Sequence, residues 1–237
     1  MIFQDILFER VILIFWFQLW PIIYSSIFAY RILKRKRTRL TRTLSYFFLL
    51  SAIAFLLPFL SLLLLFNPVA YALYITAFYL FVFSQSFLIV FSMNINELIP
   101  LKKQRAWVLF YGSISTYVFF FGIFFNGIRY DASTDWIPVF SIIFLVINWV
   151  FVTFSFIFPE GILAYKLIKE LKGKEAKKRI RNLVISTYLE FFVVYLIILY
   201  NALVDNIFFK NFIAIANLAI GFCAALLIYL SIGKKWE

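Results

Sequence analysis

The feature that most constrains this chain is a series of seven long apolar runs separated by short polar segments. The runs cover about residues 11–30, 44–66, 70–93, 106–125, 136–158, 183–204 and 211–232. Each is long enough for a helix across a hydrocarbon core roughly 30 Å thick, which takes about 20 residues. Strict alternation of apolar and polar residues, the pattern of a membrane barrel, is absent. We therefore predict an all-α integral membrane protein, a single domain over 1–237 with seven transmembrane helices.

Composition supports a lipid environment. Hydrophobic residues make up 65% of the chain and charged residues 14%, whereas soluble domains carry about 25% charged residues. A water-soluble fold of this length has too little interior to bury so much apolar surface, so lipid is the expected solvent.

The basic residues gather on every second loop. All of the 23 Lys and Arg residues except Arg10, Arg129 and Lys210 follow the first, third, fifth or seventh run. The remaining loops and the N-terminal segment carry five acids: Asp5, Glu9, Asp131, Asp135 and Asp205. Because basic loops stay in the cytoplasm, we predict an external N-terminus and an internal C-terminus, which agrees with an odd number of spans.

The densest basic segments are candidate contact surfaces. They include Arg35, Lys36 and Arg37 in the first loop and Lys177, Lys178 and Arg179 in the fifth. Clusters beside apolar runs are typical of membrane topology, so nucleic-acid binding is not expected. The lipid bilayer is the predicted partner, with anionic lipids and a cytoplasmic signalling protein as candidates for these loops. Topology alone is the alternative explanation, and the oligomeric state is left open.

The fifth helix is expected to continue into the cytoplasm beyond its apolar run. Glu170 and Lys174 are four residues apart, as are Glu175 and Arg179, a spacing that favours helical ion pairs. Gly173 is a candidate interruption of that extension.

Two segments of the chain resemble one another. Ala29–Lys34 reads AYRILK and Ala164–Lys169 reads AYKLIK, each at the basic end of an apolar run. This predicts a 3+1+3 parallel repeat, with the fourth helix as a linker. A chance match between basic helix ends is the alternative.

Glu190 is the most informative polar residue inside a predicted span. It lies nine residues beyond Arg181, roughly 13 Å along a helix. A charge at the centre of a bilayer costs about 2.5–3.5 kcal/mol on insertion scales. Ser186, Glu190, Asn201 and Asp205 fall on one helix face. The functional interpretation is a proton or ligand site, and the alternative is a carboxyl group that hydrogen-bonds to a neighbouring helix.

Other spans carry isolated polar side chains that are further candidates for a ligand or proton site: Gln85, Ser92, Asn148 and Asn217. Each is equally explained as an interhelical hydrogen bond. Glu160 is expected near the inner interface, with the basic loops as its partners.

The chain lacks the residues of common catalytic and metal sites. It has no histidine and one cysteine, Cys223, and no paired catalytic motif is evident. We therefore predict no metal, no cofactor and no enzymatic activity. The run from Asn211 to Ile232 contains no lysine, and Lys210 is too shallow for a Schiff base, so an opsin-like retinal protein is not expected.

The end of the chain, from Gly221-Phe222 through Leu227-Ile228-Tyr229-Leu230 to Lys234-Lys235-Trp236-Glu237, resembles the exit of the seven-helix membrane sensor region that precedes prokaryotic signalling domains. The resemblance implies a receptor-like module in a prokaryotic plasma membrane. No signalling domain is predicted in this sequence, so a separate cytoplasmic partner would receive the signal.

Three functions are therefore open. The first, which the sequence favours over the two alternatives, is a receptor-like or sensory bundle, and it predicts an outside-facing pocket. The second is a small transporter or channel with Glu190 as its proton or ion site, which predicts a polar path. The third is a structural subunit of a membrane complex, which predicts a polar stripe facing lipid.

Overall fold

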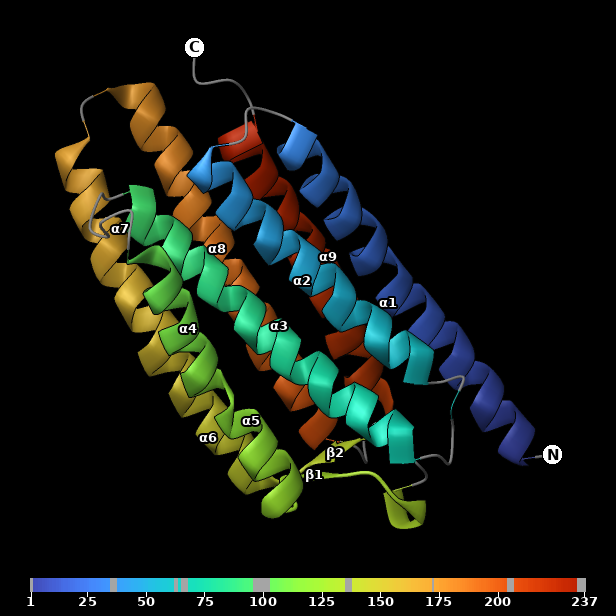
Figure 1. The fold of residues 1–237 in the computed structure, drawn as a ribbon. Helices are drawn as coiled ribbons and strands as arrows, with labels where there is room; N and C mark the ends of the chain where they lie inside the picture. Colours follow the sequence, from blue (N-terminus) through green and yellow to red (C-terminus); the bar gives the residue numbers. More distant parts are fainter. Residues whose placement is uncertain are drawn as a thin grey trace.

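The computed structural model describes residues 2–34, 38–61, 64, 68–95, 103–134, 138–171, 173–203 and 207–233. Its long helices run side by side as one elongated bundle (Figure 1). The helices are α1 (Ile2–Lys34), α2 (Arg39–Ser61), α3 (Pro68–Ile95), α4 (Gln104–Ser115), α5 (Tyr117–Phe119), α6 (Ile142–Val152), α7 (Phe158–Glu170), α8 (Lys174–Ala202) and α9 (Ile207–Gly233). Two π-helical turns, η2 (Phe120–Phe124) and η4 (Thr153–Ile157), extend α5 and join α6 to α7.

Six helical segments of the described chain are long and apolar enough to cross a membrane. They are Arg39–Ser61, Pro68–Ile95, Gln104–Phe124, Ile142–Glu170, Lys174–Ala202 and Asn211–Ser231. The chain thus has the architecture of a multi-pass membrane protein. That α1 forms a seventh span remains a prediction from its sequence.

The helix ends fall on the two ends of the bundle in the order that the charge pattern predicts. The described basic ends of α1, α7 and α8 share one end, and α1 begins at the opposite end from that where α9 finishes (Figure 1). Which end faces the cytoplasm remains a prediction, as does the 3+1+3 repeat.

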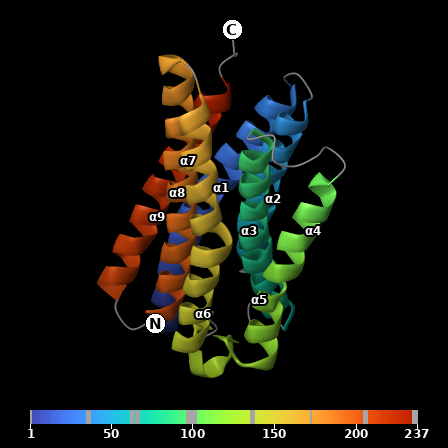
Figure 2. The same ribbon diagram turned by 90° about the vertical axis from the view of Figure 1, so that its left-hand side faces the viewer.

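Helix α3 lies at the centre of the packing. It contacts α2, α4, α5, α7 and α8, while α1 packs between α2 and α9. Aromatic side chains fill much of the interior: the rings of Phe28 on α1 and Tyr229 on α9 stack at 4.8 Å between centroids, and those of Phe140 and Phe144 meet edge to face at 5.0 Å. Figure 2 shows α4 beside α3, on the side away from α8 and α9.

A short hairpin closes the end of the bundle opposite to the basic helix ends. Strand β1 (Ile128–Arg129) pairs antiparallel with β2 (Val139–Phe140), and a 3₁₀ turn, η3 (Ala132–Thr134), lies between them. Gly127 is required here, because a Cβ atom would lie 2.3 Å from the carbonyl oxygen of Phe121. The fifth predicted span therefore starts later than residue 136: Ser141 caps α6 by accepting a hydrogen bond from the amide of Phe144 at 3.2 Å.

The two helices at the basic end are longer than their apolar runs. Helix α7 reaches Glu170, which confirms the expected extension, and α8 already begins at Lys174. Gly173 separates them with a φ of 112°, a conformation that favours glycine. The expectation that Glu170 and Lys174 share a helix is therefore wrong, whereas the Glu175–Arg179 pair is confirmed at 3.3 Å.

The outward faces of the helices carry large apolar side chains. Phe208 is 82% exposed and Ile142 is 76% exposed, and Phe124, Phe154 and Phe212 are also exposed. In lipid these side chains are solvated, because the surrounding acyl chains are equally apolar.

Candidate functional site

Most of the polar side chains that the sequence analysis proposes for a ligand or proton site lie inside the bundle. Gln85, Ser92, Asn148, Glu190 and Asn201 are all buried, and Asn217 is half-buried. Asp205, Arg35, Lys36 and Arg37 lie outside the described residues. Lys177 and Lys178 are exposed on the first turns of α8, and Arg179 is half-buried there.

A hydrogen bond between α3 and α8 sets the relative height of these two helices. The Tyr74 hydroxyl donates to Oδ1 of Asn201 at 2.8 Å, and Nδ2 of Asn201 donates to the carbonyl of Ile197 at 2.7 Å. Tyr74 was not among the sequence candidates. A tyrosine hydroxyl that is buried usually finds a hydrogen-bond partner, and this requirement is the signal that could have identified Tyr74.

Gln85 and Glu190 lie at the same depth, on the faces that carry this hydrogen bond. Each is 11 residues from its member of the Tyr74–Asn201 pair, and the helices are antiparallel. Eleven residues make just over three full helical turns, with a rise of roughly 16 Å. Gln85 and Glu190 therefore lie at a similar depth of the bundle, about 16 Å along it from the Tyr74–Asn201 hydrogen bond.

The α3 side of this region is rich in hydrogen-bonding groups. Ser51 on α2 donates to Ser84 on α3 at 3.2 Å, and Nε2 of Gln85 donates to the same Ser84 hydroxyl at 3.3 Å. Oε1 of Gln85 and the hydroxyl of Ser86 have no hydrogen-bond partner among the described residues. Because a buried unsatisfied polar group costs about 1–3 kcal/mol, these atoms are free to receive a ligand or a water molecule.

The other side of the region is formed by α1 and α9. An electrostatic interaction couples Glu190 to Tyr24 of α1. The Tyr24 hydroxyl in turn lies against Gly221 of α9, where a Cβ atom would be 3.3 Å from it. Gln18 Oε1 on α1 and Asn217 Oδ1 on α9 are also buried without a described hydrogen-bond partner. Helix positions thus group Glu190 and Tyr24 with three further polar side chains of the interior, and we call this set the Glu190 cluster: Gln18, Tyr24, Gln85, Glu190 and Asn217.

A second buried carboxyl group lies near the basic end of the bundle. Glu160 of α7 is 1% exposed and accepts a hydrogen bond from the Ser92 hydroxyl of α3 at 2.8 Å. Its other oxygen, Oε2, has no hydrogen-bond partner among the described residues. The sequence pointed to the basic loops as partners of Glu160. The structure instead turns this side chain inward toward α3, with Tyr111 and Tyr188 within electrostatic range.

The π-helical turn η4 explains why Asn148 and Glu160 both face the interior. In a regular α-helix, 12 residues would rotate them about 120° apart, and the one extra residue of a π-turn reduces this to about 20°. Asn148 is fully paired: Oδ1 accepts from the Tyr117 hydroxyl, and Nδ2 donates to the carbonyl of Phe144 at 2.7 Å. Asn148 is therefore a structural link between α5 and α6, which was the alternative interpretation.

Tyrosine hydroxyls from neighbouring helices donate to carbonyl oxygens in or beside both π-turns. Tyr71 donates to Gly122 at 2.8 Å, and Tyr195 donates to Trp149 at 3.0 Å. In lipid, where water is not available to carbonyl groups of an irregular turn, such donors stabilise the departure from α-helical geometry.

The described residues contain no group of three or more His, Cys, Asp or Glu side chains that could hold a metal ion. Cys223 is exposed on α9.

Comparison with known proteins gives no assignment. No protein-family model matches the chain, and no match was found among curated proteins or solved structures.

Proposed function

We propose that this chain is a small transporter or channel in which Glu190 is the intramembrane proton or ion site. The proposal rests on the Glu190 cluster, in which a buried carboxyl group occurs in the same part of the bundle interior as polar atoms that lack described partners. Intramembrane carboxyl groups typically mark proton relays and ion pathways. A carboxyl group with only a packing role would be expected among satisfied neighbours, as Asn148 is.

The arrangement supports reversible proton binding at one depth of the bundle. Gln85 Oε1 and Asn217 Oδ1 are acceptors, so each can receive a hydrogen bond from a protonated carboxyl group or share a cation with a carboxylate. Ser92 of the central helix α3 and Glu160 of α7 form a second polar pair nearer the basic end. Glu190 and Glu160 would therefore supply two proton-binding positions at different depths of the bundle.

Proton flux into liposomes tests the proposal. The purified chain is reconstituted with an internal pH dye, and a potassium diffusion potential drives proton entry. We expect Glu190→Gln to reduce the flux to that of protein-free liposomes, because glutamine keeps the shape but cannot exchange a proton. Glu175→Gln, on the exposed first turn of the same helix, is the matched control and should retain the wild-type flux.

Equal proton flux through the wild type and Glu190→Gln would remove Glu190 from this role. A wild type indistinguishable from protein-free liposomes would contradict proton conduction itself.

A receptor-like or sensory bundle is the second candidate, and the hairpin of α7 and α8 favours it. This hairpin exposes Lys177 and Lys178 on the first turns of α8, ahead of its apolar run at 183–204, where a cytoplasmic partner could bind. Crosslinking from a photoreactive residue at position 177 would capture such a partner. The structural-subunit alternative is less well supported, since the polar side chains named above are buried within the bundle rather than turned toward lipid.

A further inference from the structure

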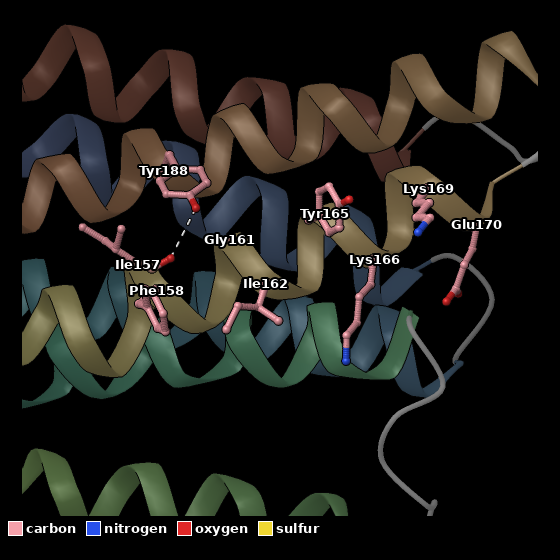
Figure 3. Close-up of a pocket in the computed structure, with 9 residues that line it drawn as sticks. All are labelled: Ile157, Phe158, Gly161, Ile162, Tyr165, Lys166, Lys169, Glu170 and Tyr188. Atoms are coloured by element: carbon pink, nitrogen blue, oxygen red, sulfur yellow. Dashed lines mark hydrogen bonds between the residues drawn. The ribbon is translucent and has the colours of Figure 1, made fainter.

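An elongated groove lies on the outer surface of α7 and α8, away from the Glu190 cluster. Its volume is about 940 Å³, and its lining comes mainly from α7, with Tyr188 of α8 and Ile157 of the preceding π-turn. Figure 3 shows Ile157, Phe158 and Tyr188 at one end of the groove and Lys166, Lys169 and Glu170 toward the other.

The groove changes chemistry along its length. The end of the groove nearer the middle of the bundle's length is apolar and is lined by Ile157, Phe158 and Ile162. The Tyr188 hydroxyl at this end donates a hydrogen bond to the carbonyl of Ile157 at 3.3 Å. Gly161 keeps this part open, because a Cβ atom at that position would lie 2.8 Å from the Tyr188 hydroxyl. The other end carries two exposed lysines.

The dimensions and the charges match one leaflet of a bilayer. From Ile157 to Lys169 the helix rises roughly 18 Å, close to half of the roughly 30 Å hydrocarbon core. Lys166 and Lys169 are three residues apart, so they occupy neighbouring positions on one helix face. They lie in the last two turns of the apolar helical segment Ile142–Glu170, where headgroups are expected.

We propose that this groove binds an anionic phospholipid, with the headgroup phosphate between Lys166 and Lys169 and one acyl chain along Ile157, Phe158 and Ile162. Tyr165 lies between the two parts, at the level where a tyrosine ring favours the glycerol region. On the predicted orientation, the lipid belongs to the inner leaflet.

Glu170 narrows the choice of headgroup. Its carboxylate is at the lysine end of the groove, where it disfavours additional negative charge and can accept hydrogen bonds from hydroxyl groups. Phosphatidylglycerol has one phosphate charge and two free hydroxyls, which fits this arrangement. The site does not depend on any role of Glu190.

Lipid titration of the detergent-purified full chain, followed by native mass spectrometry, tests the proposal. Phosphatidylglycerol and phosphatidylcholine with identical acyl chains are compared. We expect preferential retention of phosphatidylglycerol, and about thirtyfold weaker binding in Lys166→Gln/Lys169→Gln, from the attraction typical of two surface lysines. The control, Lys177→Gln/Lys178→Gln, removes the same charge outside the groove and should bind like the wild type.

Equal retention of the two lipids, or equal weakening in both double variants, would overturn the proposal, since either result indicates attraction to general positive charge. Circular dichroism of both variants verifies that the helical content is unchanged. A charge-preserving variant, Lys166→Arg/Lys169→Arg, should retain the preference, and its failure to do so would also contradict phosphate binding.

Discussion

At the scale of single residues, the interior separates polar groups with a complete set of partners from those without one. Asn148 and Asn201 use both their oxygen and their nitrogen in described hydrogen bonds. Gln85 and Glu160 each retain one buried oxygen without a described partner. In lipid a polar atom cannot exchange its missing bond for water, so incomplete pairs mark the positions most able to accept a ligand or a proton.

The Ser92–Glu160 hydrogen bond is expected to stabilise the contact between α3 and α7. In a double-mutant cycle, Ser92→Ala and Glu160→Leu should show a coupling free energy of about 0.6 kcal/mol, the average for interhelical hydrogen bonds in membranes. Unfolding of the reconstituted chain in mixed micelles measures it.

Ser45→Ala is the matched control for that cycle. Ser45 is also buried, but its hydroxyl donates to the carbonyl of Thr41 in its own helix at 2.8 Å. It should show no coupling with Glu160→Leu. A coupling as large as that of Ser92 would mean that Glu160 responds to any loss of packing.

At the residue level, the sequence identified the polar side chains inside the spans but did not identify their hydrogen-bond partners. The apolar surroundings made Glu190, Gln85 and Asn201 conspicuous, and helical spacing placed Glu190 and Asn201 on one face. The pairing of Asn201 with Tyr74 depends on which helices are neighbours, a tertiary property that a single sequence does not contain. For the same reason Glu160 was expected beside basic loops, whereas the structure directs it toward Ser92.

At the scale of elements, the apolar pattern of the sequence predicts the helices but does not predict the two π-turns. Apolar length located the ends of α3, of the segment from α4 to η2 and of α9 to within about four residues, whereas α2, α7 and α8 each have an end that differs from the prediction by five residues or more. The segment Thr153–Ile157 contains no proline or glycine that would indicate a π-turn in the sequence. The one residue that this turn adds to the helix nevertheless determines the helix face on which Glu160 lies. Tyr195 stabilises the turn from a neighbouring helix, and long-range contacts of this kind escape analysis of a local window.

Deletion of one residue should therefore have different effects in two helices. Removing the exposed Phe154 converts the π-turn into an α-helical turn and leaves α6 and α7 in their present orientations. Removing the exposed Phe192 from α8 rotates everything after it by about 100° and separates Asn201 from Tyr74. Thermal unfolding in detergent should show a much larger loss of stability for the Phe192 deletion.

The two deleted residues are alike in type and in exposure to lipid, so each serves as the control for the other. Equal destabilisation would contradict the structural role assigned to the π-turn. Oε1 of Glu160 should still accept its hydrogen bond from Ser92 in the Phe154 deletion, which the double-mutant cycle can verify in that background.

At the scale of the whole molecule, the basic helix ends lie together and the hairpin lies opposite them. This common placement follows from an alternation of charge that is legible in the sequence, because each crossing of the bundle brings the chain to the other end. The packing order, with α3 central and α1 between α2 and α9, has no comparable signal in the sequence.

The predicted threading places the hairpin outside the cell and the hairpin of α7 and α8 inside it. In a Cys223→Ala background, Ser133→Cys should react with a membrane-impermeant maleimide on intact cells, and Lys177→Cys should react only after permeabilisation. Both native side chains are exposed, so a difference between them reports sidedness. The reverse pattern would invert the orientation, and labelling of both on intact cells would contradict an integral bundle.

The exposed phenylalanines on the helix surfaces have a consequence for how such a chain can diverge. Their surroundings are fluid acyl chains that impose no particular shape, so Phe208, Phe212 and Ile142 can exchange with other large apolar residues at little cost. The interior positions, where rings and hydroxyls meet specific partners, have far fewer acceptable replacements. We therefore expect the buried tyrosines, serines and carboxyl groups to vary little among related sequences, and the lipid-facing apolar side chains to vary more.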